Sequence, residues 1–91
     1  MLRTHTGRTA TDIELTEARQ HVAEFYLDLA RSVRDGEMSF APHVTEADKK
    51  IEEQRYANTA SRVLNGDHDT EFWCWQKMNE FITGECIAFL P

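Results

Sequence analysis

The chain has 91 residues, a formal net charge of −6 at pH 7 and 41% hydrophobic residues. A chain of this length forms one domain with a single small core, and its composition is that of a folded protein, neither disordered nor membrane-embedded. Its acidic balance, 16 Asp and Glu against 10 Lys and Arg, disfavours tight binding to a nucleic-acid backbone, which requires clustered positive charge.

The N-terminal segment shows no helical periodicity, and we expect residues 1–10 to form a flexible arm of one helical domain that spans residues 1–91. Neither this segment nor any later one has the apolar run of a secretion signal or of a membrane helix, which needs about 20 residues. The sequence therefore predicts a cytoplasmic protein with no membrane-spanning segment. In that compartment Cys74 and Cys86 are reduced thiols.

A long amphipathic helix is predicted from about residue 11 to residue 34. Thr11 and Asp12 are candidate N-caps, and Gly36 follows the end of the helix. Apolar side chains recur at intervals of three and four residues, as in a helix that packs against another helix. The members of this stripe are Leu15, Ala18, Val22, Phe25 and Leu29. The stripe spans fewer than four heptads, so it favours an intramolecular bundle over a coiled-coil dimer.

A second helix is predicted after a loop over residues 35–44. Thr45 opens it, with Asp48 completing an approximate capping box, and Asn65 and Gly66 form its stop signal. We expect an i,i+4 ion pair near its start, between Glu46 and Lys50. Its apolar face lies in the second half, so we expect the first half to be weakly anchored or to contact a different surface. The residues of that face are Tyr56, Ala57, Ala60, Val63 and Leu64.

A third helix is predicted from about Thr70 to Thr83, with Gly84 as its stop signal. Residues 84–91 form an apolar tail that is too hydrophobic to be left in water. We expect this tail to pack in an extended form on the helices or on a second subunit. The sequence thus predicts an all-α fold, a compact three-helix bundle with an extended C-terminal tail.

The C-terminal region concentrates both charge and aromatic residues. Residues 66–91 carry five acidic side chains against the single base Lys77, and they include five of the nine aromatic residues. In a helical projection Trp73 falls on the polar side of the third helix, whereas Trp75 falls on its apolar side. An exposed tryptophan with a charged rim is typical of an interface hot spot, while burial under the tail or under the loop around Phe40 makes it structural. The candidate partner-binding residues are Trp73, Lys77, Glu80, Asp67, Asp69 and Glu71.

Five potential metal ligands lie within eight positions at the start of this region. They are Asp67, His68, Asp69, Glu71 and Cys74. Their spacing matches no known metal-binding loop, and we expect the acids to cap the third helix instead. Cys74 falls on an apolar helix face, and no Gly-rich phosphate loop or nucleophile–base pair is recognisable. The sequence therefore predicts a protein that is not an enzyme, with no catalytic residues, no cofactor and no metal.

These features favour a small acidic, non-catalytic protein-binding module. We expect an inhibitor, an immunity-type protein or an adaptor that binds a basic protein through its acidic, aromatic-rich C-terminal region. Compact acidic helical proteins of this size are common among toxin-immunity proteins and phage or mobile-element inhibitors, which is an analogy of class. Two alternatives remain open: a nucleic-acid-directed regulator that uses Arg3 and Arg8 of the N-terminal arm, and a self-associating structural subunit such as a homodimer.

Overall fold

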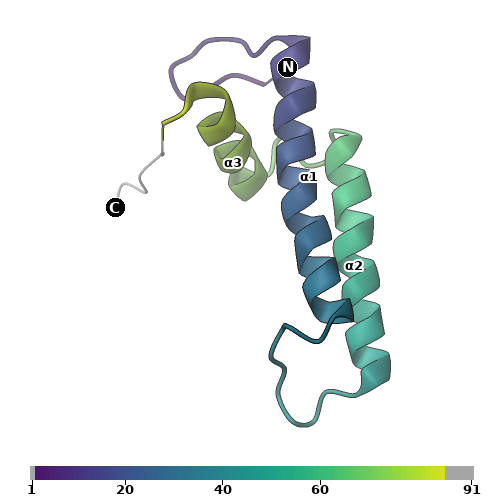
Figure 1. Cartoon of the computed structure of the whole chain (residues 1–91). Helices are drawn as coiled ribbons and strands as arrows, with labels where there is room; N and C mark the ends of the chain where they lie inside the picture. The colour runs from purple at the N-terminus through teal and green to yellow at the C-terminus, as the bar shows by residue number, and fades with distance from the viewer. Residues whose placement is uncertain (1, 86–91) are drawn as a thin grey trace.

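The computed structural model describes residues 2–85, which form three helices: α1 (Asp12–Arg34), α2 (Glu46–Leu64) and α3 (Phe72–Thr83). The long helices α1 and α2 form an antiparallel hairpin, and the short α3 lies beside the N-terminal half of α1 (Figure 1). Both α2 and α3 pack on α1, and within residues 2–85 they do not pack on each other. The predicted all-α fold of three helices is confirmed. The predicted packing of the tail, from residue 86 onward, lies outside the described residues.

The first two helices begin where the sequence predicted, because each has a complete capping box. The Thr11 hydroxyl accepts from the Glu14 N–H at 3.1 Å, and the Glu14 carboxylate accepts from the Thr11 N–H at 3.0 Å. Thr45 and Asp48 make the same reciprocal pair, with both distances 3.1 Å. Each box satisfies two backbone donors that the helix itself leaves free. Of the two candidates for the N-cap of α1, the structure uses Thr11.

The anchorage of α2 comes from its second half. Ala60 and Val63 are its buried residues, and both lie within the last five positions of the helix. The predicted weak attachment of the first half is therefore confirmed. The predicted pairing there is wrong in detail: Glu46 binds Lys49, at 3.1 Å, and not Lys50. A three-residue spacing brings side chains together on a helix surface as well as a four-residue spacing does.

The core lies where α1 meets α2 on one side and α3 on the other. Its buried members are Leu2, Ala10, Leu15, Ala18, Val22, Ala23, Ala60, Val63, Cys74 and Met78. Phe25, which the sequence placed in the core stripe of α1, is 48% exposed. That expectation is wrong because Phe25 lies at the edge between α1 and α3, where the two helices leave a hollow.

Residues 2–10, which we expected to be a flexible arm, form a closed loop packed against the rest of the chain. Three backbone bonds close it: Thr4 N–H to Arg8 O at 2.8 Å, Gly7 N–H to Thr4 O at 2.9 Å and Ala10 N–H to Leu2 O at 3.0 Å. Leu2, Thr4 and Ala10 are buried. Burial of the apolar side chains of Leu2 and Ala10 stabilises the folded loop. A count of charges along the sequence does not predict this contribution.

This N-terminal loop (residues 2–10) changes which side chains of α3 are buried. Gln76 and Asn79 are buried although both are polar, whereas Phe72 is 54% exposed and Phe81 is 43% exposed. A helical projection places Phe72 and Phe81 on the apolar side of α3 and Gln76 on its polar side, so it is wrong for these three residues. Cys74 and Met78, also on the apolar side, are buried as expected. Instead α3 is covered on more than one side, since it lies on α1 and also contacts the loop, where the Trp75 indole N–H donates to the Arg3 carbonyl at 2.8 Å.

Candidate functional site

Trp73 is held by aromatic contacts to α1. Its ring centroid lies 5.4 Å from that of Phe25, at an interplanar angle of 46°, and 5.7 Å from that of Tyr26, at 67°. Tilted and edge-on arrangements of this kind stabilise aromatic pairs beyond their area of burial. Trp73 therefore packs on α1 and not under the loop around Phe40. It remains partly exposed within residues 2–85. The predicted cover by the tail, from residue 86 onward, lies outside the described residues.

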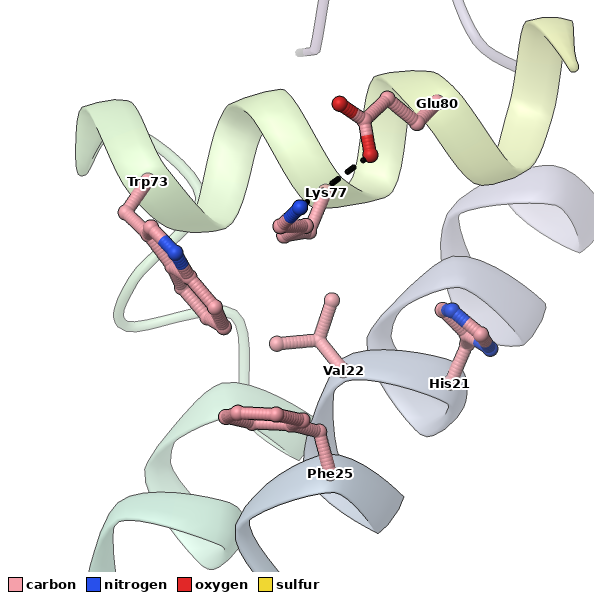
Figure 2. Close-up of a pocket in the computed structure, with 6 residues that line it drawn as sticks. All are labelled: His21, Val22, Phe25, Trp73, Lys77 and Glu80. Atoms are coloured by element: carbon pink, nitrogen blue, oxygen red, sulfur yellow. Dashed lines mark hydrogen bonds and ion pairs between the residues drawn. The ribbon is translucent and has the colours of Figure 1, made fainter. Parts of the chain in front are cut away.

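The exposed side of Trp73 borders a pocket between α1 and α3, with a volume of about 260 Å³. Figure 2 shows side chains of both helices around this space, with Val22 between Phe25 of α1 and Lys77 of α3. Its lining consists of His21, Val22, Phe25, Trp73, Lys77 and Glu80. Two aromatic walls, an aliphatic base and a charged rim make this hollow suitable for one side chain that is both flat and polar at its end.

A second, shallower hollow continues from this pocket along α1. His21 lines both hollows, and its ring stacks on Phe81 with centroids 4.7 Å apart and an interplanar angle of 24°. Glu17 and Glu24 of α1 line its other side. We call the two adjoining hollows the α1–α3 groove. Three carboxylates and one ammonium group line it within the described residues, so its charge is negative.

Each acid of the C-terminal region pairs with an Arg, Lys or His side chain. The pairs are Asp67–Arg62, Asp69–Arg19, Glu71–His68, Glu80–Lys77 and Glu85–His5. Glu17 and Glu24, by contrast, form no ion pair within residues 2–85. Arg19 of α1 and Arg62 of α2 thus bring positive charge to Asp69 and Asp67, whereas Glu71 and Glu85 are paired with histidines, which are charged only when protonated. The groove carboxylates that form no ion pair within residues 2–85 both come from α1.

The structure brings together three of the six residues proposed for partner binding. Trp73, Lys77 and Glu80 line the pocket from α3. The other three lie in the turn that connects α2 to α3, outside the groove, and they are Asp67, Asp69 and Glu71. The groove also contains residues that the sequence did not indicate as binding residues, because it placed them at the edge of the α1 stripe, opposite that stripe or on the apolar faces of the helices. They are Glu17, His21, Glu24 and Phe25, together with Phe81 of α3.

The turn before α3 has a structural role that differs from the predicted one. Glu71 is the N-cap residue of α3 but makes no side-chain cap bond, and α3 has no acid in its first turn. The expectation that these acids cap α3 is therefore wrong. Asp69 instead accepts from the Arg19 guanidinium, with the Nε–Oδ1 distance 3.1 Å and a second bond from Nη2. This paired contact ties the turn to α1.

The titratable groups near the turn show neither a metal site nor an activated thiol. Within residues 2–85 no group of three or more His, Cys, Asp or Glu side chains is placed to hold a metal ion. Burial, reinforced by the carboxylates of Asp69 and Glu71, raises the pKa of Cys74 to about 11. A thiol with this pKa is protonated at pH 7, and the thiolate is the nucleophilic form. Cys74 therefore acts as a small buried hydrophobe.

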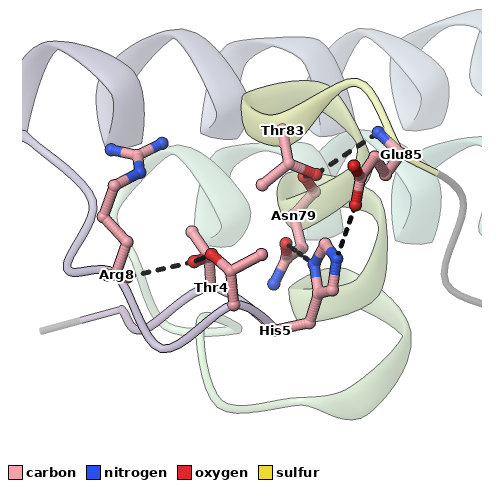
Figure 3. A network of polar contacts seen from close by, with 7 residues as sticks. Thr4, His5, Arg8, Asn79, Thr83 and Glu85 are labelled. Carbon is pink, nitrogen blue, oxygen red and sulfur yellow. Dashed lines mark hydrogen bonds and ion pairs between the residues drawn. The ribbon is translucent and has the colours of Figure 1, made fainter.

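A polar network joins the N-terminal loop to the end of α3 (Figure 3). His5 lies with Nδ1 2.7 Å from Asn79 Oδ1 and Nε2 3.0 Å from Glu85 Oε2. The hydrogen bond to Asn79, followed by that to Glu85, raises the pKa of His5 above its usual 6.5. Asn79 follows Lys77 by two positions, about 200° around the helix. The network therefore fastens a face of α3 different from the one that lines the groove.

No protein-family model, curated protein or solved structure matches this chain. None of the helices within residues 2–85 is long and apolar enough to cross a membrane.

Proposed function

We propose that this protein is a small, non-catalytic protein-binding module that receives a basic segment of another protein in the α1–α3 groove. The observation that carries the proposal is the combination of aromatic rings and uncompensated carboxylates in one groove. Partly exposed aromatic side chains within a polar rim are the usual anchors of protein interfaces. Complementary charge steers the partner toward them and selects against acidic proteins.

The exposed aromatic residues supply the apolar part of this interface. Phe25 is 48% exposed and Phe81 is 43% exposed, although both side chains are large and apolar. Covering half of a phenylalanine side chain stabilises a complex by about 1 kcal/mol, since full burial contributes roughly 1.5–3 kcal/mol. Trp73 lines the same pocket as Phe25 and adds the residue type most enriched among interface hot spots.

The charged part of the interface indicates the class of partner. Glu17 and Glu24 form no ion pair with a Lys, Arg or His side chain within the described residues, so they attract a positively charged surface of the partner. We infer an inhibitor, immunity-type protein or adaptor of the cytoplasm, encoded by a phage or other mobile element, whose association with its partner weakens as salt is added. At physiological ionic strength the screening length is about 8 Å, so contributions from rim charges fall steeply with added salt.

The alternative of a nucleic-acid regulator depends on a free basic arm. Arg8 donates from Nη1 and Nη2 to the two carboxylate oxygens of Glu14, at 2.8 and 3.0 Å. Arg3 donates to the Gly7 carbonyl at 3.3 Å. These contacts engage the positive charge that phosphates require, so we favour the protein-binding function.

Affinity capture tests the proposal directly. The tagged full chain is compared with Phe81→Ser, which alters the groove, and with Ile51→Ser, which alters an apolar side chain of α2 that is 61% exposed and lies outside the groove. We expect a basic protein to be retained by the parent chain and by Ile51→Ser, and to be lost by Phe81→Ser. Circular dichroism checks that both variants are folded. Retention by Phe81→Ser, or equal loss by both variants, contradicts the proposal.

A further inference from the structure

We infer that the pocket lined by Trp73, Phe25 and Glu80 is a receptor for a single arginine side chain of the partner, whose guanidinium group displaces Lys77 from Glu80. This inference rests on the proposed function and specifies the chemistry of its central contact. Each part of the pocket contributes a separate argument.

The carboxylate of Glu80 has a cationic partner that holds it only loosely. Lys77 Nζ lies 3.4 Å from Glu80 Oε2, whereas ammonium–carboxylate hydrogen bonds are commonly about 2.7–2.9 Å long. The Glu80 side chain is only 21% exposed, so water does not fully solvate its charge. A partly desolvated carboxylate with one long contact is stabilised further by a donor that binds it at a shorter distance. Arginine is that donor, because its planar guanidinium group binds both carboxylate oxygens at once.

Lys77 itself indicates the chemistry that the pocket accepts. Its side chain extends from α3 into the space between Trp73 and Glu80, with the ammonium group directed at the carboxylate (Figure 2). The chain thus places one of its own cations beside the Glu80 carboxylate, in a pocket that Trp73 also lines. The Lys77 side chain is 41% exposed and sits on a flexible stem, so it swings into water without disturbing the core.

The walls of the pocket suit a guanidinium group better than a purely apolar side chain. The rings of Trp73 and Phe25 are tilted by 46° and form two aromatic sides of the space. Arginine stacks on aromatic faces and is more weakly hydrated than lysine, so it enters such a site at a lower desolvation cost. A leucine in the same place removes water from Glu80 and Lys77 without offering either of them a hydrogen bond.

The size of the pocket limits its occupant to one side chain. Its volume of about 260 Å³ is below the range of roughly 300–1,000 Å³ that is typical of sites for whole small molecules. Glu17 and Glu24, farther along the groove, lie outside this pocket but draw positive charge toward it. A segment with one arginine for the pocket and further bases for the groove fits both features.

Titration of the ¹⁵N-labelled full chain with N-acetyl-arginine-methylamide tests the inference. The indole N–H of Trp73 reports on the pocket, and the indole N–H of Trp75, which is bonded to the Arg3 carbonyl, is an internal control. We expect a saturable shift of the Trp73 signal with no shift of the Trp75 signal. The citrulline analogue has the same shape without the charge, and we expect it to shift neither signal.

Two variants test the displacement of Lys77. Glu80→Gln removes the charge that receives the guanidinium group, and we expect it to weaken the binding of the arginine probe at least tenfold. Lys77→Met keeps the aliphatic stem but removes the competing cation, and we expect binding to strengthen about threefold to tenfold. An unchanged Trp75 signal in each variant shows that α3 and the N-terminal loop keep their structure.

Other outcomes overturn the inference and are distinguishable from failure of the proposed function. A Trp73 shift of equal size with N-acetyl-leucine-methylamide means that the pocket takes an apolar side chain, and a missing shift with every probe means that it takes none. Weaker binding of the arginine probe to the Lys77→Met variant contradicts the displacement of Lys77 from Glu80. If the captured partner is lost by Phe81→Ser but retained unchanged by Glu80→Gln, the groove binds protein without an arginine in the pocket.

Discussion

Gly66 links the end of α2 to the turn that precedes α3, and it provides a sharp test of how that turn is held. Its φ is +85°, a left-handed conformation that side chains disfavour. A Cβ atom on Gly66 lies 2.9 Å from Arg19 Nη2 and 3.1 Å from Arg19 Cζ. Because Arg19 holds Asp69, Gly66→Ala forces the guanidinium group away from the carboxylate that ties the turn to α1.

The expected cost of Gly66→Ala has two parts. The left-handed backbone costs alanine about 1–2 kcal/mol, partly offset because alanine reduces the entropy of the unfolded chain by about 0.4–1 kcal/mol. Loss of the Arg19–Asp69 contact adds about 1–2 kcal/mol, a value reduced for solvent screening because the side chains are 27% and 21% exposed. Gly36 also has a positive φ, +74°, but a Cβ there meets nothing within 4 Å. Gly36→Ala therefore isolates the backbone part.

Urea unfolding followed by circular dichroism measures both costs. We expect Gly66→Ala to lower the free energy of unfolding by about 1–2 kcal/mol more than Gly36→Ala does, which corresponds to roughly 4–16 °C of additional loss in Tm. In an Arg19→Ala background this additional loss should vanish, because the clash and the ion pair are both absent. Equal costs for the two glycines, or an additional loss that persists without Arg19, would refute the reasoning.

Three further predictions concern the core, the N-terminal loop and the thiol. Met78 is fully buried, so Met78→Ala should lower the free energy of unfolding by about 2–5 kcal/mol in urea titrations, and a loss below 1 kcal/mol contradicts its place in the core. The pKa of His5 is raised by its bond to Asn79, so its stabilising contribution is full below the unfolded value near 6.5 and is lost as the pH rises through the folded value. An NMR titration that finds a pKa for His5 at or below 6.5 contradicts the hydrogen bond between His5 and Asn79. Cys74 has a pKa of about 11, so in a Cys86→Ser background iodoacetamide should label it at pH 8 only after unfolding, and rapid labelling of the native protein is the contrary result.

The sequence predicted the helices well because their ends depend on local interactions. Thr11 and Thr45 supply the capping boxes, and Gly84 adopts the left-handed conformation that ends α3. Each of these signals acts over a few residues and is legible in a single chain. The burial of the polar residues Gln76 and Asn79 in α3 could not be predicted in this way. It depends on the N-terminal loop, which contacts Asn79 from a position 74 residues earlier in the chain.

The candidate site was predicted only from the side of α3. Trp73, Lys77 and Glu80 share one edge of that helix, so a helical projection grouped them. Phe25 and the other groove residues of α1 were missed, because no spacing within α3 reveals which edge of α1 it meets. The charge of the turn was misjudged for the same reason, since Asp69 is neutralised by Arg19 across 50 positions of sequence.

The central claim is that a basic protein binds in the α1–α3 groove, and photo-crosslinking from single positions tests it most directly. p-Benzoylphenylalanine in place of Phe81 puts the probe in the groove, and the same residue in place of Ile51 puts it on an exposed position outside the groove. We predict a crosslink to the captured basic protein from position 81 and none from position 51. A partner that crosslinks from position 51 but not from position 81 contradicts the claim.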